Sequence, residues 1–389
     1  MNWNRHGSGM RNTKMYLDLL VFAFIICFLF KQFIFVAVIS FLLLIGLIQI
    51  IYYRKVGKKF EFVNDKKRIR LMKDTSSDFI LTFQNKGLPI WNAVLTISFQ
   101  TNIEPEGISN TTIGDFHEVK IPFSIGYKKS VSLNVPIKGV SRGLAKIKQL
   151  HVQIPHPLTD GSILLEFKPY ILKDAIVFPN IYNIEGDFAP SKLKQGDLAL
   201  NSSLFDDPFF PVGTREYEPG DQFNHIHWKA SAKTQQLQTK VFTHVANVSV
   251  LFVVNVGEKY SVLSDFEDKL EWLASYIDAC YKEDIPFSFA LNVRASGKVP
   301  FVYLPLGSGD SHRIQAMELL SILSIANSII PFDKLLTYLD LHEELPVATF
   351  VMTHHLETYT PLLHRWEQRT NVLYKSPAEI GGISHGYND

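Results

Sequence analysis

The stretch that decides the architecture is the apolar run LDLLVFAFIICFLFKQFIFVAVISFLLLIGLIQIIYY, residues 17–53. It contains only two charged residues, Asp18 near its start and Lys31 near its middle. A single helix of this length would be roughly 55 Å long, nearly twice the thickness of the hydrocarbon core of a membrane. Because Lys31 and the glutamine after it divide the run, we predict a helical hairpin with membrane spans at about residues 15–30 and 33–53.

Basic residues flank this run on both sides. Residues 1–14 contain three basic residues and no acidic one, and residues 54–73 contain nine basic and two acidic residues. Residues 74–389, by contrast, contain 26 basic and 35 acidic side chains, a net charge of −9. Lysine and arginine beside membrane spans favour the cytoplasmic side, so we expect both flanks and the large domain that follows to be cytoplasmic. The acidic body also argues against nucleic acid as a partner.

After the basic N-terminus and hairpin, residues 1–56, the region 57–180 is predicted to form an antiparallel β-sandwich. Short runs rich in apolar and β-branched residues alternate there with Gly, Pro and Asn turn signals, a spacing typical of such folds. The runs are residues 79–84, 93–99, 131–137, 146–154 and 163–167. The chain has two cysteines, Cys27 and Cys280, so a fold stapled by several disulfides is excluded.

A polar connector, residues 181–245, contains the stretch GTREYEPGDQFNHIHWKASAK at 213–233. Residues 218–221 predict a β-turn, because proline fixes φ and glycine accepts a positive φ. Asp221 or Asn224 is expected to cap a short helix that runs through Ala232. Residues 237–245 alternate in polarity as a strand does.

Two interpretations of this stretch remain open. In the first, Arg215, Glu216 and Asp221 form a charge-assisted network that holds the turn, and Tyr217 and Trp228 act as aromatic anchors. The network is then structural, a surface for a partner, or both. The full set of candidate partner-binding residues is Arg215, Glu216, Tyr217, Pro219, Gly220, Asp221, His227, Trp228, Lys229 and Ser231.

The second interpretation is catalytic or metal-binding. His227 and Ser231 are four residues apart and would share a helix face, as a base and a nucleophile must. No Gly-x-Ser-x-Gly elbow accompanies them, and histidines two apart on a helix, such as His225 and His227, face different ways. We therefore assign no catalytic residue and no metal ligand here, and keep a hydrolase or transferase using His227, Ser231 and Asp221 as an alternative.

From residue 246 to 376, before a tail at 377–389, apolar strand patterns alternate with helical ones. Strand-like runs lie at 248–256, 287–293, 299–304, 346–353 and 371–374. Helical periodicity covers 262–281, 313–327, 332–341 and 359–369. This alternation predicts an α/β domain with a mainly parallel sheet covered by helices.

The strings REYEPGD at 215–221 and IHWKASAK at 226–233 resemble the signature of the domain of unknown function 58 family, bacterial proteins with an N-terminal membrane hairpin. The resemblance implies a multi-pass protein of the bacterial cell membrane with a C-terminal von Willebrand factor type A-like domain. It also implies partners that are commonly encoded beside such proteins: an AAA+ ATPase of the MoxR type and a transglutaminase-like membrane protein. It supplies no reaction.

Ligand-binding domains of the von Willebrand type carry Asp-x-Ser-x-Ser after the first strand, where these side chains hold a divalent metal. The matching positions here are residues 255–259, where Asn255 replaces the aspartate and neither serine is in place. Because hard cations need carboxylate ligands, Asn255 marks a degenerate metal site. We expect neither a metal nor another cofactor.

The expected function is therefore that of a membrane-anchored, non-enzymatic adaptor or assembly protein. Its cytoplasmic domain would dock protein partners, the MoxR-type ATPase among them. Besides the enzyme alternative above, a structural cell-envelope protein remains possible, and that reading places the large domain outside the cytoplasm.

Overall fold

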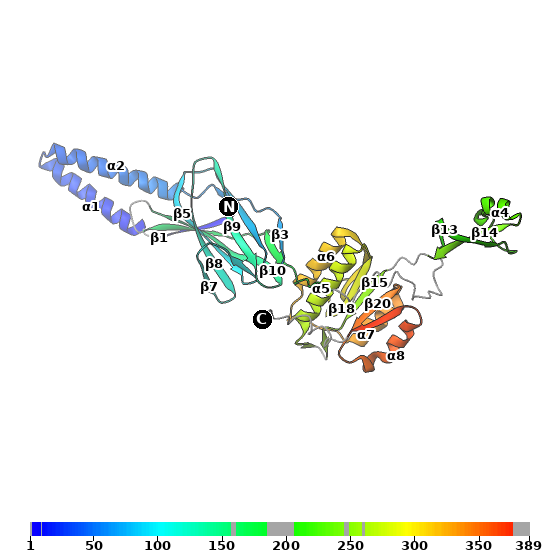
Figure 1. Cartoon of the computed structure of the whole chain (residues 1–389). Helices are drawn as coiled ribbons and strands as arrows, with labels where there is room; N and C mark the ends of the chain where they lie inside the picture. Colours follow the sequence, from blue (N-terminus) through cyan, green and yellow to red (C-terminus); the bar gives the residue numbers. More distant parts are fainter. Residues whose placement is uncertain are drawn as a thin grey trace, which may run out of the picture. The chain divides into compact units, whose positions relative to one another are not determined.

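The computed structural model describes residues 2–8, 10–156, 161–184, 206–244, 249–258 and 261–375. The chain forms two compact units. The first comprises Met1–Asn180 together with Glu318–Leu323, and the second comprises Ile181–Met317 together with Ser324–Asp389. Figure 1 shows the elements of both units, coloured along the sequence.

The apolar run forms two helices, α1 (Met10–Leu29) and α2 (Phe33–Lys55), which lie side by side as an antiparallel pair (Figure 1). Lys31 takes a left-handed φ of 59° in the tight turn between them. Helix α2 is long and apolar enough to cross a membrane. The predicted break at Lys31 is confirmed, whereas α1 begins about five residues earlier than expected and α2 ends two residues later.

A strand precedes the helices, and the sequence analysis did not predict it. Residues Trp3–Ser8 form β1, which pairs antiparallel with β11 (Ser162–Phe167), so that Trp3 lies opposite Phe167. The indole of Trp3 is 5% exposed and packs against the rings of Phe60 and Phe167. The chain before α1 is therefore part of the same folded unit as the chain after α2.

Two sheets build the rest of the first unit. One has eight strands in the order β1-β11-β10-β5-β8-β7, with β12 added beside β10 and β3 beside β12; the other has the order β2-β4-β9-β6. All strand pairs are antiparallel except β12 with β3. The bounds not yet given are β2 (Phe60–Phe62), β3 (Arg68–Leu71), β4 (Ser76–Asn85), β5 (Ile90–Gln100), β6 (Ile103–Pro105), β7 (Asn110–Ile113), β8 (Phe116–Ile125), β9 (Lys129–Gly139), β10 (Gly143–Pro155) and β12 (Asp174–Val177).

Side chains from both sheets fill a single apolar core, as the prediction of a β-sandwich requires. Alternate residues of β4 and β5 are fully buried, and Phe79 of one meets Phe99 of the other with ring centroids 5.4 Å apart. Each of the five predicted runs forms a strand. Strands β2, β3, β6, β7, β8 and β12 lie outside the predicted runs.

The second unit contains a five-stranded sheet in the order β19-β18-β15-β20-β21. All neighbours are parallel except the edge strand β19, so the predicted mainly parallel sheet is confirmed. Helices α5 and α6 lie on one face and α7 and α8 on the other (Figure 1). The bounds are β15 (Val250–Val254), α5 (Phe266–Lys282), β18 (Phe287–Arg294), β19 (Phe301–Gly307), α6 (Gly309–Ile322), α7 (Phe332–His342), β20 (Ala348–Met352), α8 (Leu356–Glu367) and β21 (Asn371–Lys375).

The strand order gives this sheet a point where the topology reverses. From β15 the chain winds to one side through β18 and β19, then returns to β20 on the other side of β15. Open α/β sheets bind ligands in the crevice beyond the carboxyl ends of two strands related in this way. Here that crevice is formed by the residues that follow Val254 and Met352.

Candidate functional site

The predicted signature folds as a local structure, which we call the signature arm (residues 213–240). Its base is an antiparallel pair of strands, β13 (Asp206–Glu216) and β14 (Gln238–His244), in which Arg215 lies opposite Thr239. Between them lie a single 3₁₀ turn, η1 (Phe223–His225), and the short helix α4 (Trp228–Thr234). The strand predicted at 237–245 is present over Gln238–His244, and residue 245 lies outside the described residues.

The β-turn predicted at residues 218–221 is present. The backbone N–H of Asp221 donates to the carbonyl of Glu218 at 3.0 Å, which closes the turn. Gly220 takes a φ of 120°, a backbone conformation that residues with a Cβ rarely adopt. The turn brings the carboxylate of Asp221 back toward β13.

Asp221 is the centre of the hydrogen bonds that hold the arm. Its Oδ1 lies 2.5 Å from Nη2 of Arg215, and its Oδ2 accepts from the backbone N–H of Glu218 at 3.1 Å and from the hydroxyl of Thr239 at 2.9 Å. These bonds, the one from Arg215 first, lower the pKa of Asp221 to about 2. Glu216 takes part only through its backbone carbonyl, which accepts from Nη1 of Arg215 at 3.0 Å.

The helix cap differs from the prediction, because neither Asp221 nor Asn224 caps α4. His227 occupies the N-cap position, and its Nδ1 accepts from the backbone N–H of Ala230 at 3.1 Å. The hydroxyl of Ser231 donates to the backbone carbonyl of His227 at 3.1 Å and accepts from the backbone N–H of Gln238 at 2.9 Å. Asp221 is bonded within the turn and Asn224 lies in η1, so the residue directly before α4, His227, caps the helix.

The aromatic residues of the arm lie on its surface. Phe223 is 74% exposed and Trp228 is 56% exposed, and their rings meet edge to face with centroids 5.4 Å apart. Tyr217 and Leu237 are also exposed. Of the other predicted residues, Pro219, Gly220 and Lys229 are exposed as well. The hydrogen bonds therefore fix the backbone, while the aromatic side chains face outward and Ile226 is buried.

The second predicted position, Asn255, lies at the carboxyl end of β15 and is fully buried. Its Nδ2 donates to Thr353 Oγ1 at 3.2 Å, and its Oδ1 accepts from Nδ2 of Asn292 at 2.9 Å. Asn292 also binds three backbone groups: it accepts from Val256 N–H and donates to the carbonyls of Gly257 and Ile330. The two amides tie the ends of β15, β18 and β20 together. The sequence contains a signal for Asn292 that was not used, an amide within the largely apolar run 287–293.

A buried lysine supplies positive charge at this edge of the sheet. Lys269 of α5 is 1% exposed, and its Nζ lies 3.0 Å from Oδ2 of Asp265, which also binds Nε2 of His354 at 2.8 Å. Burial lowers the pKa of Lys269. The sequence analysis missed this residue as well, although Lys269 is spaced three and four residues from Phe266 and Leu273 on the apolar face of α5.

These residues do not fit a divalent metal. The amide oxygen of Asn255 already binds Asn292, and the carboxylate of Asp265 faces the ammonium group of Lys269. Within the described ranges, no three His, Cys, Asp or Glu side chains are grouped so as to hold a metal ion.

Beside this network lies a pocket of about 500 Å³ at the topological reversal. It is lined by Gly257, Glu258, Pro331, Phe332, Asp333, His355, Thr358 and Tyr359. Nε2 of His355 lies 3.5 Å from Oε1 of Glu258, so His354 and His355 reach different carboxylates. Burial, with the carboxylates of Glu258 and Asp333, raises the pKa of Tyr359. Two carboxylates and no described lysine or arginine line the pocket, which favours cationic groups over anionic ones.

Comparison with protein families gives a match to part of the chain. Residues 213–320, from the signature arm into α6, match the family model described as protein of unknown function DUF58. No curated protein matches the chain.

Similar solved structures cover 31% of this chain each. They are a non-cellulosomal cohesin from the archaeon Archaeoglobus fulgidus (14% identity, 89% of that chain, TM-score 0.22), the C-terminal domain of wzt (13% identity, 72% of that chain, TM-score 0.20) and an ASH/PapD-like domain of human CEP192 (12% identity, 84% of that chain, TM-score 0.17). TM-scores this low carry no conclusion about this chain.

Proposed function

The chain belongs to the DUF58 family through residues 213–320, and on that premise we propose that it is a membrane-anchored, non-enzymatic docking protein whose signature arm binds a protein partner. The observation that carries the proposal is the exposed pair Phe223 and Trp228 on a backbone held by the Arg215–Asp221 ion pair. Large aromatic side chains on a rigid support are typical of the residues that dominate protein interfaces.

The proposed anchor is the helical pair, with two membrane spans. Strand β1 before α1 and strand β2 after α2 belong to one folded unit. If α2 crosses the membrane, α1 must cross it in the opposite direction, because the strands before α1 and after α2 lie on the same side. The basic residues at both flanks support a cytoplasmic location for that side and for the large domain.

The proposed partner is the AAA+ ATPase of the MoxR type that the family resemblance implies, with the transglutaminase-like membrane protein as a further component. The strand order of the second unit, with one antiparallel edge strand, supports a von Willebrand factor type A-like domain. Lys269 and Asn255 support a domain of this kind that works without metal, since an internal cation and an amide stand where carboxylates and metal would be needed.

The catalytic alternative finds less support in the geometry of the arm. The hydroxyl of Ser231 binds backbone groups and not the imidazole of His227, and that imidazole accepts a bond from the helix it caps. A nucleophile needs its base within hydrogen-bond reach. We therefore propose no reaction for His227, Ser231 and Asp221.

The test is retention of the purified MoxR-type ATPase by the full chain in mild detergent, with ADP, with ATP and without nucleotide. Trp228→Ala should abolish retention, because it removes one half of the exposed aromatic pair. Trp91→Ala is a matched control: Trp91 is also 56% exposed and also contacts one ring, that of Tyr52, with centroids 5.5 Å apart. No retention of the ATPase by the unaltered chain in any nucleotide state would refute the proposal. Equal losses of retention in the Trp228→Ala and Trp91→Ala variants would show that the signature arm is not the docking surface.

A further inference from the structure

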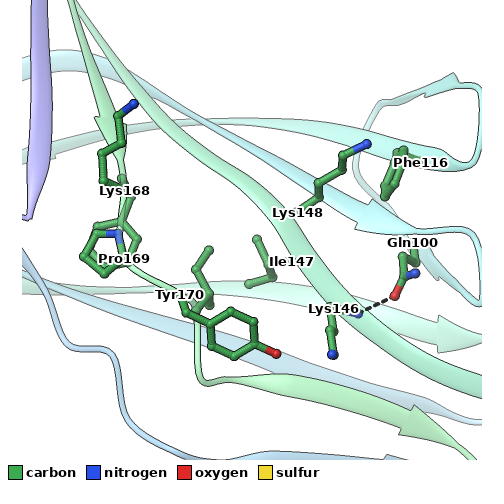
Figure 2. A pocket seen from close by; sticks show the side chains of 10 residues that line it. Gln100, Phe116, Lys146, Ile147, Lys148, Lys168, Pro169 and Tyr170 are labelled. Carbon is green, nitrogen blue, oxygen red and sulfur yellow. Dashed lines mark hydrogen bonds between the residues drawn. The ribbon is translucent and has the colours of Figure 1, made fainter. Parts of the chain in front are cut away.

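A second pocket lies on the eight-stranded sheet of the first unit, in a region to which neither the family match nor the proposed docking role assigns a task. It has a volume of about 420 Å³, within the size range of small-molecule sites. Its lining residues are Gln100, Phe116, Lys146, Ile147, Lys148, Phe167, Lys168, Pro169, Tyr170 and Ile171. Figure 2 shows lysine side chains on two sides of a floor made by Ile147, Pro169 and Tyr170.

The charge of this pocket is positive and is not neutralised locally. Three of the lining residues are lysines and none is a carboxylate. Lys146 and Lys148 form no ion pair with any residue that the structure describes; their Nζ atoms lie 5.7 Å from the ring centre of Tyr170 and 3.9 Å from that of Phe116. Lys168 lies 3.9 Å from Glu166, and Asp174, which is opposite Lys146 in the strand register, is paired with Arg68. Cation–π contacts hold an ammonium group in place while leaving its hydrogen-bond donors available.

The fold explains why the lysines meet here. One edge of strand β10 has two partner strands: residues 151–155 pair with β11, and residues 143–146 pair with β12. Between these segments, residues 147–150 pair with neither strand. On the opposite edge, the register with β5 shifts between Ile147 and Gln149, which places Lys148 in a β-bulge. Bulges re-aim side chains and are enriched beside functional sites. The segment 168–171 after β11 closes the pocket from the other side.

We propose that this pocket binds a soluble phosphate-bearing small molecule, with Lys146 and Lys148 on the phosphate and the rings of Phe116 and Tyr170 against its apolar part. Lysine binds phosphate as a point charge, and several donors without a competing carboxylate favour a multiply charged anion.

A lipid headgroup carries the same phosphate chemistry, but the strand register favours a soluble source. Ser8, two residues before α1, lies opposite Ser162, which in turn lies opposite Pro155. Lys148 precedes Pro155 by seven residues along β10, a distance of about 20 Å at the rise of a strand. The potential of a charged membrane surface decays over about 8 Å at physiological salt. This step rests on the proposed membrane anchor, whereas phosphate binding itself does not.

The test measures binding of inorganic pyrophosphate to the full chain in an uncharged detergent by isothermal titration calorimetry. The unaltered chain should bind it, and the double variant Lys146→Gln with Lys148→Gln should bind about tenfold more weakly, because two partly exposed charge contacts are lost. The variant Lys146→Arg with Lys148→Arg should retain binding. Both lysines are exposed, so the thermal unfolding of these variants should not change.

The matched control is Lys128→Gln with Lys129→Gln, which removes the same charge from the same unit. Lys128 also lies over a ring, that of Tyr127 at 5.2 Å, but lines no pocket described here. Affinity in this control should stay within about twofold of the unaltered chain. No binding of pyrophosphate, or equal weakening in the two double variants, overturns the site.

The source is tested in nanodiscs of phosphatidylcholine, with and without phosphatidylglycerol. The pyrophosphate affinity should be the same in both. Loss of pyrophosphate binding when phosphatidylglycerol is added would show that lipid headgroups fill the pocket, and would overturn the assignment of a soluble ligand.

Discussion

Nζ of Lys269 lies 3.0 Å from Oδ2 of Asp265, and the lysine side chain is 1% exposed at the carboxyl edge of the central sheet. A buried ammonium group is costly unless it is paired, so this contact is a requirement of the fold as well as an electrostatic feature of the candidate site.

Removal of the lysine charge is therefore expected to destabilise the second unit. Lys269→Met should lower the free energy of unfolding by about 3 kcal/mol, because Asp265 loses its buried partner. Adding Asp265→Asn should recover part of this loss. Denaturant unfolding followed by tryptophan fluorescence measures both. Lys282→Met is the matched control, since Lys282 pairs with Asp278 on the same helix at the same 3.0 Å and spacing but is 70% exposed; its cost should be below about 0.5 kcal/mol. Equal costs would contradict this role for Lys269.

The pKa of Asp221, lowered to about 2 mainly by Arg215, predicts how the signature arm responds to acid. A carboxyl group with a lowered pKa stabilises the fold fully above its ordinary pKa near 4, and this contribution is lost as the pH falls through the folded value. A fluorine label on Trp228 should therefore report an unchanged arm down to about pH 3. In Arg215→Gln the transition should move up toward about pH 4. Coincident transitions in the two proteins would show that Arg215 does not set this pKa.

The N-cap role of His227 can be separated from a chemical role by one substitution. His227→Ala should weaken α4 by about 1 kcal/mol, whereas His227→Asn should restore it, because asparagine is a preferred N-cap. Hydrogen exchange at the amides of residues 230–234 measures the helix, and ATPase retention measures docking. If the His227→Asn protein keeps its helix protected from exchange but does not retain the ATPase, the imidazole has a role beyond capping the helix.

The pairing of β1 with β11 predicts the membrane topology. Reporters before Trp3 and after Asp389 should both be active in the cytoplasm, since both flanks of the helical pair are basic and lie in one folded unit. In a Cys27→Ala background, Gln32→Cys at the turn between α1 and α2 should react with a membrane-impermeant maleimide added from outside. Reporters on opposite sides would exclude a two-span hairpin, and an external C-terminal reporter would favour the cell-envelope alternative.

Much of this architecture was predictable from the sequence, because it depends on local patterns. The break at Lys31, the β-turn at Glu218–Asp221 and the alternation of strands and helices after residue 246 follow from hydropathy period, turn chemistry and the scarcity of charge in a membrane span. Each is decided by residues near one another in the chain. The ion pair of Arg215 with Asp221 also belongs here, since a tight turn returns one residue toward the other.

The tertiary structure alone decided what depends on residues far apart. The segment Trp3–Ser8 is too short and too polar for its sequence to predict a strand. It forms one because it pairs with β11, which lies more than 150 residues later in the chain. Asn255 forms an interior hydrogen bond only because Asn292 lies near the end of the neighbouring strand β18. Lys269 is an internal cation only because α5 packs it against the carboxyl edge of the sheet. Lys146 and Lys148 line a pocket because β10 has a bulge there and changes its partner strand, and both features depend on long-range pairing. Local sequence sets the secondary-structure preference of each residue, whereas long-range strand pairing and packing set which residues surround it. Those neighbours determine its hydrogen bonds, its ion pairs and the pocket that it lines.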